Sequence, residues 1–335
     1  MMMRCHRVSI ALLLLAASPA AWPAEGEATA FTPGQPQTVP PPKGRILNGH
    51  VFMPAADVPG ALPTTSFVAD MVLALGTASA PNPITIGNTT LSGDFQYAGV
   101  GNVVGYEYAF LDYFSARLII NDIVFSGING SSVLAVGTQL RVGFTGGLTA
   151  SLPIGDSLRV ALLFDAGKVP AMALTIGNGI RQIVNSCNAG SCDVNASDVF
   201  AVENATTIQP AVAASWAPMP ALGVTANVAY IHQSQDQNSG QSLSADAMSL
   251  GLATDFDFRA ISTVPVGLML QFNWTAPVNG QGLQHVTDIG GGVFYTGRQN
   301  LALGIQLISR RFQVTPDVKV SWGSYISTIG LRYYW

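Results

Sequence analysis

The residues of this chain best suited to chemistry are a histidine and a serine two positions apart, His232 and Ser234. They stand at the end of the segment Gly223–Gln233, in which apolar residues alternate with small or polar ones. Side chains two positions apart on a strand point to the same face, so the imidazole could act as general base for the serine hydroxyl. The spacing raises the hypothesis of a serine nucleophile.

This pair is similar to the His-x-Ser of outer-membrane phospholipase A and of lipid A deacylases, families in which the serine attacks a lipid ester at the outer edge of a barrel. The phospholipase family continues with Asn-Gly, whereas Gln235 and Asp236 follow here. The next strand offers Ser244 and Asp246, but no matching Asn. The competing interpretation is a polar histidine at the edge of a loop, and our leading hypothesis assigns no catalytic residue.

Two cysteines, Cys187 and Cys192, lie in the longest connection, Ala166–Ala205, with a glycine between them. In an exported protein we expect them to form a disulfide. A metal site would need about four ligands, and no histidine lies nearby. In the same connection, Ala171–Ser186 has apolar residues at helical spacing but also two glycines, so a short pore-constricting helix and an irregular loop both stay open.

The first residues indicate export. Arg4 and Arg7 precede an apolar run, and small residues follow through Ala24, which is the layout of a signal peptide. We expect cleavage between residues 20 and 24 and no cofactor or metal in the mature chain. With the signal removed, 13 basic residues stand against 19 acidic ones, a net charge near −6, which disfavours binding to nucleic acid.

Residues 25–63 are rich in proline and show neither a helical nor a strand period. We interpret them as a flexible periplasmic linker or as a plug that enters the barrel. From residue 64 to 335, twelve segments have strand character: Thr64–Gly76, Gly93–Ala109, Ser115–Ser126, Gly137–Ala150, Ser157–Asp165, Thr206–Trp216, Gly223–Gln233, Leu243–Phe258, Val264–Trp274, Val286–Thr296, Asn300–Ser309 and Ser324–Trp335.

Short and long connections alternate between these segments, as between the periplasmic turns and external loops of outer-membrane barrels. Past the signal, no apolar run approaches the length of a membrane-spanning helix. The sequence therefore predicts an all-β protein, a transmembrane antiparallel up-and-down β-barrel of about 12 strands. A soluble sandwich would also alternate, but it would need more charged residues on its outer face.

The last segment carries large apolar residues at every second position, Ile329, Leu331, Tyr333 and Trp335. It resembles the terminal aromatic strand of bacterial outer-membrane barrels, and the resemblance implies that the barrel assembly machinery recognises these four residues. The alternate register carries Arg332. Further ionisable residues expected to line the lumen are Glu107, Arg117, Arg141, Arg159, Asp165 and Asp255. Bracing of the barrel and contact with solute are both open for each of them.

The run Tyr106-Glu107-Tyr108, a tight turn and then Phe114-Ser115-Ala116-Arg117-Leu118 resembles the phenol meta-pathway degradation family of outer-membrane barrels. More distantly, the organisation resembles long-chain fatty-acid transporters. The resemblance implies a passive outer-membrane channel for a small organic molecule, apolar or aromatic in character. A lipid ester hydrolase and a structural or adhesive barrel are the alternatives. Expected partners are outer-membrane lipid, the assembly machinery and the solute; the oligomeric state is left open.

Overall fold

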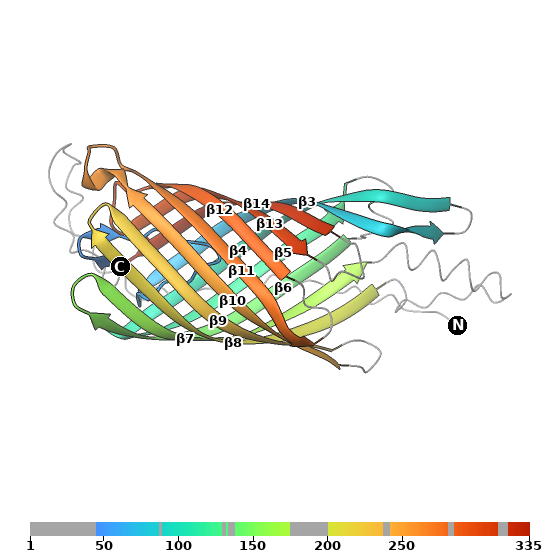
Figure 1. The fold of residues 1–335 in the computed structure, drawn as a ribbon, viewed down its shortest axis with the longest axis horizontal. Helices are drawn as coiled ribbons and strands as arrows, with labels where there is room; N and C mark the ends of the chain where they lie inside the picture. Colours follow the sequence, from blue (N-terminus) through green and yellow to red (C-terminus); the bar gives the residue numbers. More distant parts are fainter. Residues whose placement is uncertain are drawn as a thin grey trace, which may run out of the picture. The chain divides into compact units, whose positions relative to one another are not determined.

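The computed structural model describes residues 45–86, 89–128, 132, 138–174, 200–236, 242–280, 285–313 and 321–335. Within these ranges, twelve antiparallel strands close into a barrel in which each strand pairs with its neighbours in sequence and the last pairs with the first (Figure 1). The strands are β3 (Ser66–Ile86), β4 (Thr89–Leu111), β5 (Phe114–Gly127), β6 (Thr138–Ile154), β7 (Leu158–Leu174), β8 (Phe200–Met219), β9 (Leu222–Asp236), β10 (Ser242–Asp257), β11 (Val266–Gly280), β12 (His285–Tyr295), β13 (Leu301–Gln313) and β14 (Ser321–Tyr334).

All twelve predicted strands are confirmed, and the short connections lie where alternation placed them. Residues 112–113 join β4 to β5, residues 220–221 join β8 to β9, and a 3₁₀ turn, η1 (Phe258–Ala260), lies between β10 and β11. The strands extend further than predicted at their other ends. The end of β7 runs to Leu174, so Ala171–Leu174 are strand and not helix; residues 175–199 lie outside the described part of the chain.

Side chains alternate between two environments along every strand, because successive residues of a strand point to opposite faces. On β11 the side chain of Leu270 is 64% exposed and that of Met269 only 1%. Exposed large apolar side chains occur on all twelve barrel strands, among them Phe67, Leu118, Phe144, Leu162, Val212, Leu250, Ile305 and Ile329. A continuous apolar exterior of this kind requires a lipid environment, and closure leaves no unpaired strand edge in it.

Aromatic side chains collect at the end of the barrel that carries the short turns. The rings of Tyr106 and Trp335 lie 5.7 Å apart between centroids, and those of Phe110 and Phe114 are stacked at 6.1 Å. Such rings mark one membrane–water interface of a barrel. Among the described residues, no helix is long and apolar enough to cross a membrane.

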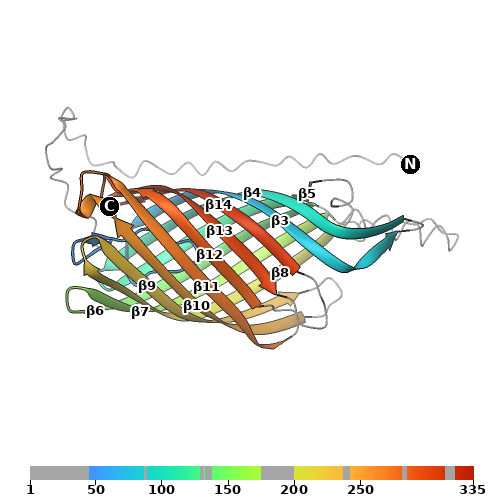
Figure 2. The ribbon, with the colours of Figure 1, turned by 45° about the horizontal axis from the view of Figure 1, so that its top comes forward.

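Two further strands precede the barrel, β1 (Ile46–Leu47) and β2 (His50–Val51). They begin a segment, Arg45–Thr65, that we call the inner segment. Its residues, in blue, lie at the end of the barrel where the chain terminates (Figures 1 and 2). The inner segment contacts side chains of most barrel strands, and these contacts form the candidate site.

Candidate functional site: the inner segment and two cavities

The inner segment starts with a tight hairpin that the sequence encodes. Asn48 and Gly49 have φ of 47° and 78°, so both residues of the two-residue turn are left-handed. Asn-Gly is the preferred pair for such a turn, since glycine has no Cβ to clash and asparagine tolerates this conformation. The hairpin pairs Ile46 with Val51 and Leu47 with His50.

The hairpin is bound to the barrel by buried polar contacts. Arg45 donates from Nη1 to the carbonyl of Gln299 at 2.6 Å, and its guanidinium lies 4.4 Å from the ring centroid of Tyr334 on β14. Asn48 Nδ2 donates to the carbonyl of Ala217 at 2.9 Å. Burial lowers the pKa of Arg45, and Tyr334 opposes that shift. The hairpin thus joins turns and strand ends from opposite parts of the barrel sequence.

His50 is the most completely buried polar side chain of the hairpin, with 0% exposure. Its Nδ1 lies 3.0 Å from the carbonyl oxygen of Pro220, and its Nε2 bonds Asp255 Oδ1 on β10. The opposite residue on β9 is Gly223, and a Cβ there would collide with His50 Nε2 and Asp255 Oδ1. Asp255, predicted as a lumenal charge, therefore faces inward but is occupied by the inner segment.

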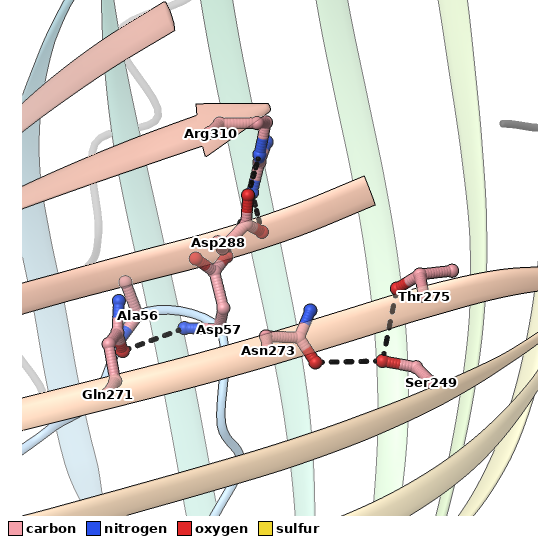
Figure 3. A network of polar contacts seen from close by, with 8 residues as sticks. All are labelled: Ala56, Asp57, Ser249, Gln271, Asn273, Thr275, Asp288 and Arg310. Carbon is pink, nitrogen blue, oxygen red and sulfur yellow. Dashed lines mark hydrogen bonds and ion pairs between the residues drawn. The ribbon is translucent and has the colours of Figure 1, made fainter. Parts of the chain in front are cut away.

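Beyond the hairpin, the inner segment passes the inner faces of β11, β12 and β13, where Ala56 and Asp57 lie beside Gln271 and Arg310 (Figure 3). Gln271 Oε1 accepts from the backbone N–H of Ala56 at 3.0 Å. Arg310 binds Asp288 through two bonds of 2.8 Å and reaches Asp57 Oδ1 at 3.2 Å. Two carboxylates therefore share one guanidinium, and one of the two belongs to the inner segment.

Two opposing effects act on the Asp57 carboxyl group. Burial raises the pKa of the Asp57 carboxyl, while the positive charge of Arg310 acts in the opposite direction. Its Oδ2 atom is buried without a hydrogen-bonding partner among the described residues. A charged group with one unsatisfied oxygen is a weak anchor, because the lost hydration is only partly replaced.

The last part of the inner segment returns to the barrel wall through small residues. Ala61 is completely buried in a cluster with Ala161, Leu163, Ala211, Ala213 and Ala229. Its N–H donates to Ser215 Oγ at 3.0 Å, and its carbonyl accepts from Ser151 Oγ at 2.6 Å. Thr64 Oγ1 then donates to Glu107 Oε2 at 3.1 Å. The segment is consequently fixed at both ends, with residues 53–60 between.

Two cavities border residues 53–60. A smaller one of about 350 Å³ is lined by this stretch and by Glu107, Arg117, Asp165, Asp255, Arg332 and Tyr334. A larger one of about 670 Å³ is lined by Pro54, Ala56 and Asp57 of the inner segment and by an apolar wall that includes Val72, Tyr97, Ile119, Ile123, Phe125, Ile308, Phe312 and Ile326. The larger cavity is within the size range of sites for small molecules.

Four of the predicted lumenal residues are used in contacts within the barrel. Arg117 and Asp165 form a bidentate pair, with Nε–Oδ1 3.0 Å and Nη2–Oδ2 2.5 Å, across Gly147. Glu107 accepts from Ser115 Oγ at 2.6 Å as well as from Thr64. Together with Asp255, these contacts favour bracing over contact with solute.

The other three predicted residues are less constrained. Arg141 lines the larger cavity and donates to Gln139 Oε1 at 3.2 Å. Arg159 lies near the short turns, where its Nη1 donates to the carbonyl of Asp112 at 3.2 Å, and it lines neither cavity. Arg332 lines both cavities, and its Nε is buried without a hydrogen-bonding partner among the described residues.

The sequence-based selection missed His50, Asp57, Asp288 and Arg310. The Asn-Gly dipeptide beside His50 was a usable signal of a folded hairpin. Arg310 was missed because the predicted strand ended at Ser309, whereas β13 continues to Gln313. Asp288 stands in the inward register of a predicted strand, and its 2% exposure follows from that register.

On the outer face, His232 Nδ1 lies 2.7 Å from Asp246 Oδ1 across the β9–β10 pair. The side chain of His232 is 42% exposed. It shares a face with the exposed Tyr230, as the alternation predicted. Ser234 lies opposite Ser244 and Thr206. The structure thus supplies an orienting carboxylate, while no hydrogen bond joins His232 to Ser234 in the described part of the chain.

Two other predictions concern the cysteines of an external loop and the terminal strand. Cys187 and Cys192 lie outside the described residues. Ile329, Leu331, Tyr333 and Trp335 all have exposed side chains, whereas Tyr334 is buried. The predicted division of faces on β14 is confirmed, and the assembly role of the outward set stays a prediction.

No protein-family model and no curated protein sequence matches the chain. The predicted membership in the phenol meta-pathway family therefore stays a prediction. Similar solved structures include an outer-membrane channel from Pseudomonas putida F1, with 11% identity, 85% of this chain and 100% of that chain covered and a TM-score of 0.48. The translocator domain of autotransporter NalP from Neisseria meningitidis has 12% identity, 81% and 89% coverage and a TM-score of 0.45.

The monoaromatic hydrocarbon channel CymD has 9% identity, 80% and 88% coverage and a TM-score of 0.37. Likeness at this level carries no argument about solute or activity. The closed twelve-stranded barrel and its apolar exterior identify the chain as an outer-membrane β-barrel.

Proposed function

We propose that this protein is a passive outer-membrane channel for small, mainly apolar molecules and that the inner segment closes it. The observation that carries the proposal is the larger cavity inside the barrel, which is lined mostly by aliphatic and aromatic side chains. A cavity of this composition favours solutes that a water-filled pore would not retain.

Closure rests on residues 53–60, which border both cavities and are held between two fixed ends. Solute passes when this stretch leaves Gln271 and Arg310. The barrel itself need not change, since its strands are paired all round. Gating by the inner segment therefore costs the few polar contacts that hold it and the burial of Met53 and Val58.

The test is single-channel recording in planar bilayers of the parent and of Arg310→Met, with Arg311→Met as the matched control. Arg310 binds Asp57, whereas Arg311 is exposed on the alternate register, so both changes remove one positive charge and only one loosens the inner segment. We expect open events to be several-fold more frequent in Arg310→Met than in the control. Absence of conductance in the parent and in both variants, together with no solute uptake by liposomes, would end the channel proposal.

The second candidate is the lipid ester hydrolase. The 2.7 Å contact of His232 with Asp246 on the outer face favours it, because a carboxylate there would orient the imidazole. Hydrolysis of a phospholipid ester in detergent, lost in Ser234→Ala and in His232→Ala, would support this activity. A structural or adhesive barrel would show neither conductance nor hydrolysis.

The export features complete the proposal. We propose that residues 1–24 are removed as a signal peptide, and that Cys187 and Cys192 form a disulfide in an external loop. Mass spectrometry of the purified protein from the outer membrane gives the mature amino terminus. Alkylation before and after reduction counts the thiols; two free thiols before reduction would contradict the disulfide.

A further inference from the structure

An acidic and a basic side chain face each other without contact beside the larger cavity. Asp70 on β3 and Arg332 on β14 occupy diagonal positions, since Asp70 lies opposite Gly330 and Arg332 opposite Val68. Their charges attract each other, but no ion pair or hydrogen bond joins them among the described residues. This contrasts with Arg117 and Asp165, which close into a bidentate pair.

The backbone leaves room for this arrangement. A Cβ at Gly330 would collide with Asp70 Oδ1, so glycine lets the carboxylate lie over β14. Arg332 Nε is buried and unpartnered in the described structure, although unpaired buried donors are costly. Both side chains line the larger cavity, so the Asp70 carboxylate can accept from a third group there and the Arg332 guanidinium can donate to it.

On the side of the larger cavity the surroundings of the pair are mainly apolar, whereas the charge of Arg45 acts on Arg332 from the smaller cavity. Val68, Val72, Ile119 and Ala302 line the larger cavity around the pair. Arg332 also lines the smaller cavity, whereas Asp70 lines only the larger one, so Arg332 stands between the two cavities. The apolar wall contacts the apolar part of a solute there, and Asp70 and Arg332 contact its polar end.

The charges around the larger cavity cancel. Arg141, Arg310 and Arg332 are balanced by Asp57, Asp70 and Asp288, of which Asp288 acts through its bond to Arg310. Asp122 also borders this cavity, but its carboxylate faces Asn102 on the outward register. A charged solute would therefore meet repulsion from one member of the Asp70–Arg332 pair and find no excess of opposite charge.

We propose that Asp70 and Arg332 form a selectivity site for apolar molecules with an uncharged polar end that both donates and accepts, namely a hydroxyl or a carboxamide. The O–H or N–H donates to the Asp70 carboxylate, and the oxygen accepts from the Arg332 guanidinium. Carboxylates are repelled by Asp70 and ammonium groups by Arg332. Hydrocarbons without a polar end fit the cavity but leave both charges unpaired.

This inference rests on the proposed channel function, and equilibrium binding tests it separately from transport. Binding of benzyl alcohol, benzamide, benzoate, benzylamine and toluene to the purified protein in detergent is measured by titration calorimetry, with protein-free micelles as the blank. We expect the alcohol and the amide to bind at least about tenfold more tightly than the other three, since hydrogen bonds to charged groups are the stronger kind. Equal affinity of the five probes overturns the proposal even if the protein conducts.

Removing either charge should change the affinities for the charged probes in opposite ways. In Asp70→Ala we expect the alcohol to lose about tenfold in affinity while benzoate gains, and in Arg332→Met we expect benzylamine to gain instead. Arg141→Met is the control, because it removes the same charge from the same cavity and should leave the order of the probes unchanged. Parallel loss of all probes in Asp70→Ala and Arg332→Met would mean that the pair only braces the barrel, and would overturn the proposal.

Discussion

At the level of single residues, the docking of the inner segment depends on one position that has no side chain. Gly223 leaves the space in which the His50 imidazole meets Asp255. We predict that Gly223→Ala releases the hairpin, because the added methyl collides with both groups; overpacking of this kind costs about 1–3 kcal/mol. Hydrogen-exchange mass spectrometry of residues 45–63 measures the release.

The control for this prediction is Gly146→Ala. Nothing lies within 4 Å of a Cβ at Gly146, so the same change there meets no atom. Exchange in residues 45–63 should match the parent in this variant. Unchanged exchange in Gly223→Ala would contradict the role given to the His50 contact.

Asp57 gives the inner segment a dependence on pH. Because its pKa is raised on docking, the docked state binds a proton more readily than the released state. Docking is therefore strongest below the ordinary value of 3.8 and weakens as the pH rises through the raised pKa. The groups facing Asp57 are Arg310 and Asp288, which are bonded to each other.

We predict that Asp57→Asn removes this contribution, so that docking at pH 7 is at least as stable as in the parent and changes less between pH 4 and pH 7. Exchange of residues 45–63 across that range, corrected for the intrinsic pH dependence of exchange, is the measurement. A variant that keeps the full pH dependence of the parent would place the titrating group elsewhere.

At the level of elements, the strands could be predicted because burial repeats with period two. Leu148 and Leu270 fall on the lipid-facing register, and the polar residues next to them fall inside. The ends of the strands could not be predicted, since beyond the apolar band nothing in the alternation shows where pairing stops. For this reason Arg310, just beyond the predicted end of its strand, was not among the predicted site residues.

The inner segment escaped prediction for a different reason. Its side chains are held by contacts with strands far away in sequence, such as Arg45 with Tyr334 and Asp57 with Arg310. The period of the apolar residues indicates only local secondary structure, so the sequence of a segment with two-residue strands shows no regular pattern. The lumenal charges were selected by register alone, which could not show that Asp255 is occupied and Arg332 is not.

A charged substitution should destabilise the barrel far more on the lipid-facing register of a strand than on its inward register. We expect Leu148→Arg on β6 to destabilise the barrel by about 2–4 kcal/mol, because the charge would enter lipid. Thr145→Arg, on the inward register of the same strand, should cost much less, since Thr145 borders the smaller cavity. Urea titration of folding into lipid vesicles compares the two, and similar midpoints would contradict the assignment of faces.

At the level of the whole molecule, the outward residues of β14 should matter for assembly and the inward ones for the inner segment. We predict that Tyr333→Ala lowers the amount of folded protein in the outer membrane severalfold. Tyr334→Ala should assemble normally but lose the stacking of Arg45 and expose the hairpin to proteolysis. Equal assembly of the two variants would remove the special role of the outward aromatic residues.

The seam between β14 and β3 has a consequence for the order of folding. Trp335 N–H donates to the carbonyl of Thr65 at 3.2 Å, so the barrel closes by joining residues at opposite ends of its sequence. Bringing such distant residues together is slow, because the entropy of a long loop is lost before its contacts form. The inner segment can dock only after closure, since its partners come from both sides of the seam. Until β14 pairs with β3, the sheet is therefore open and its interior is exposed.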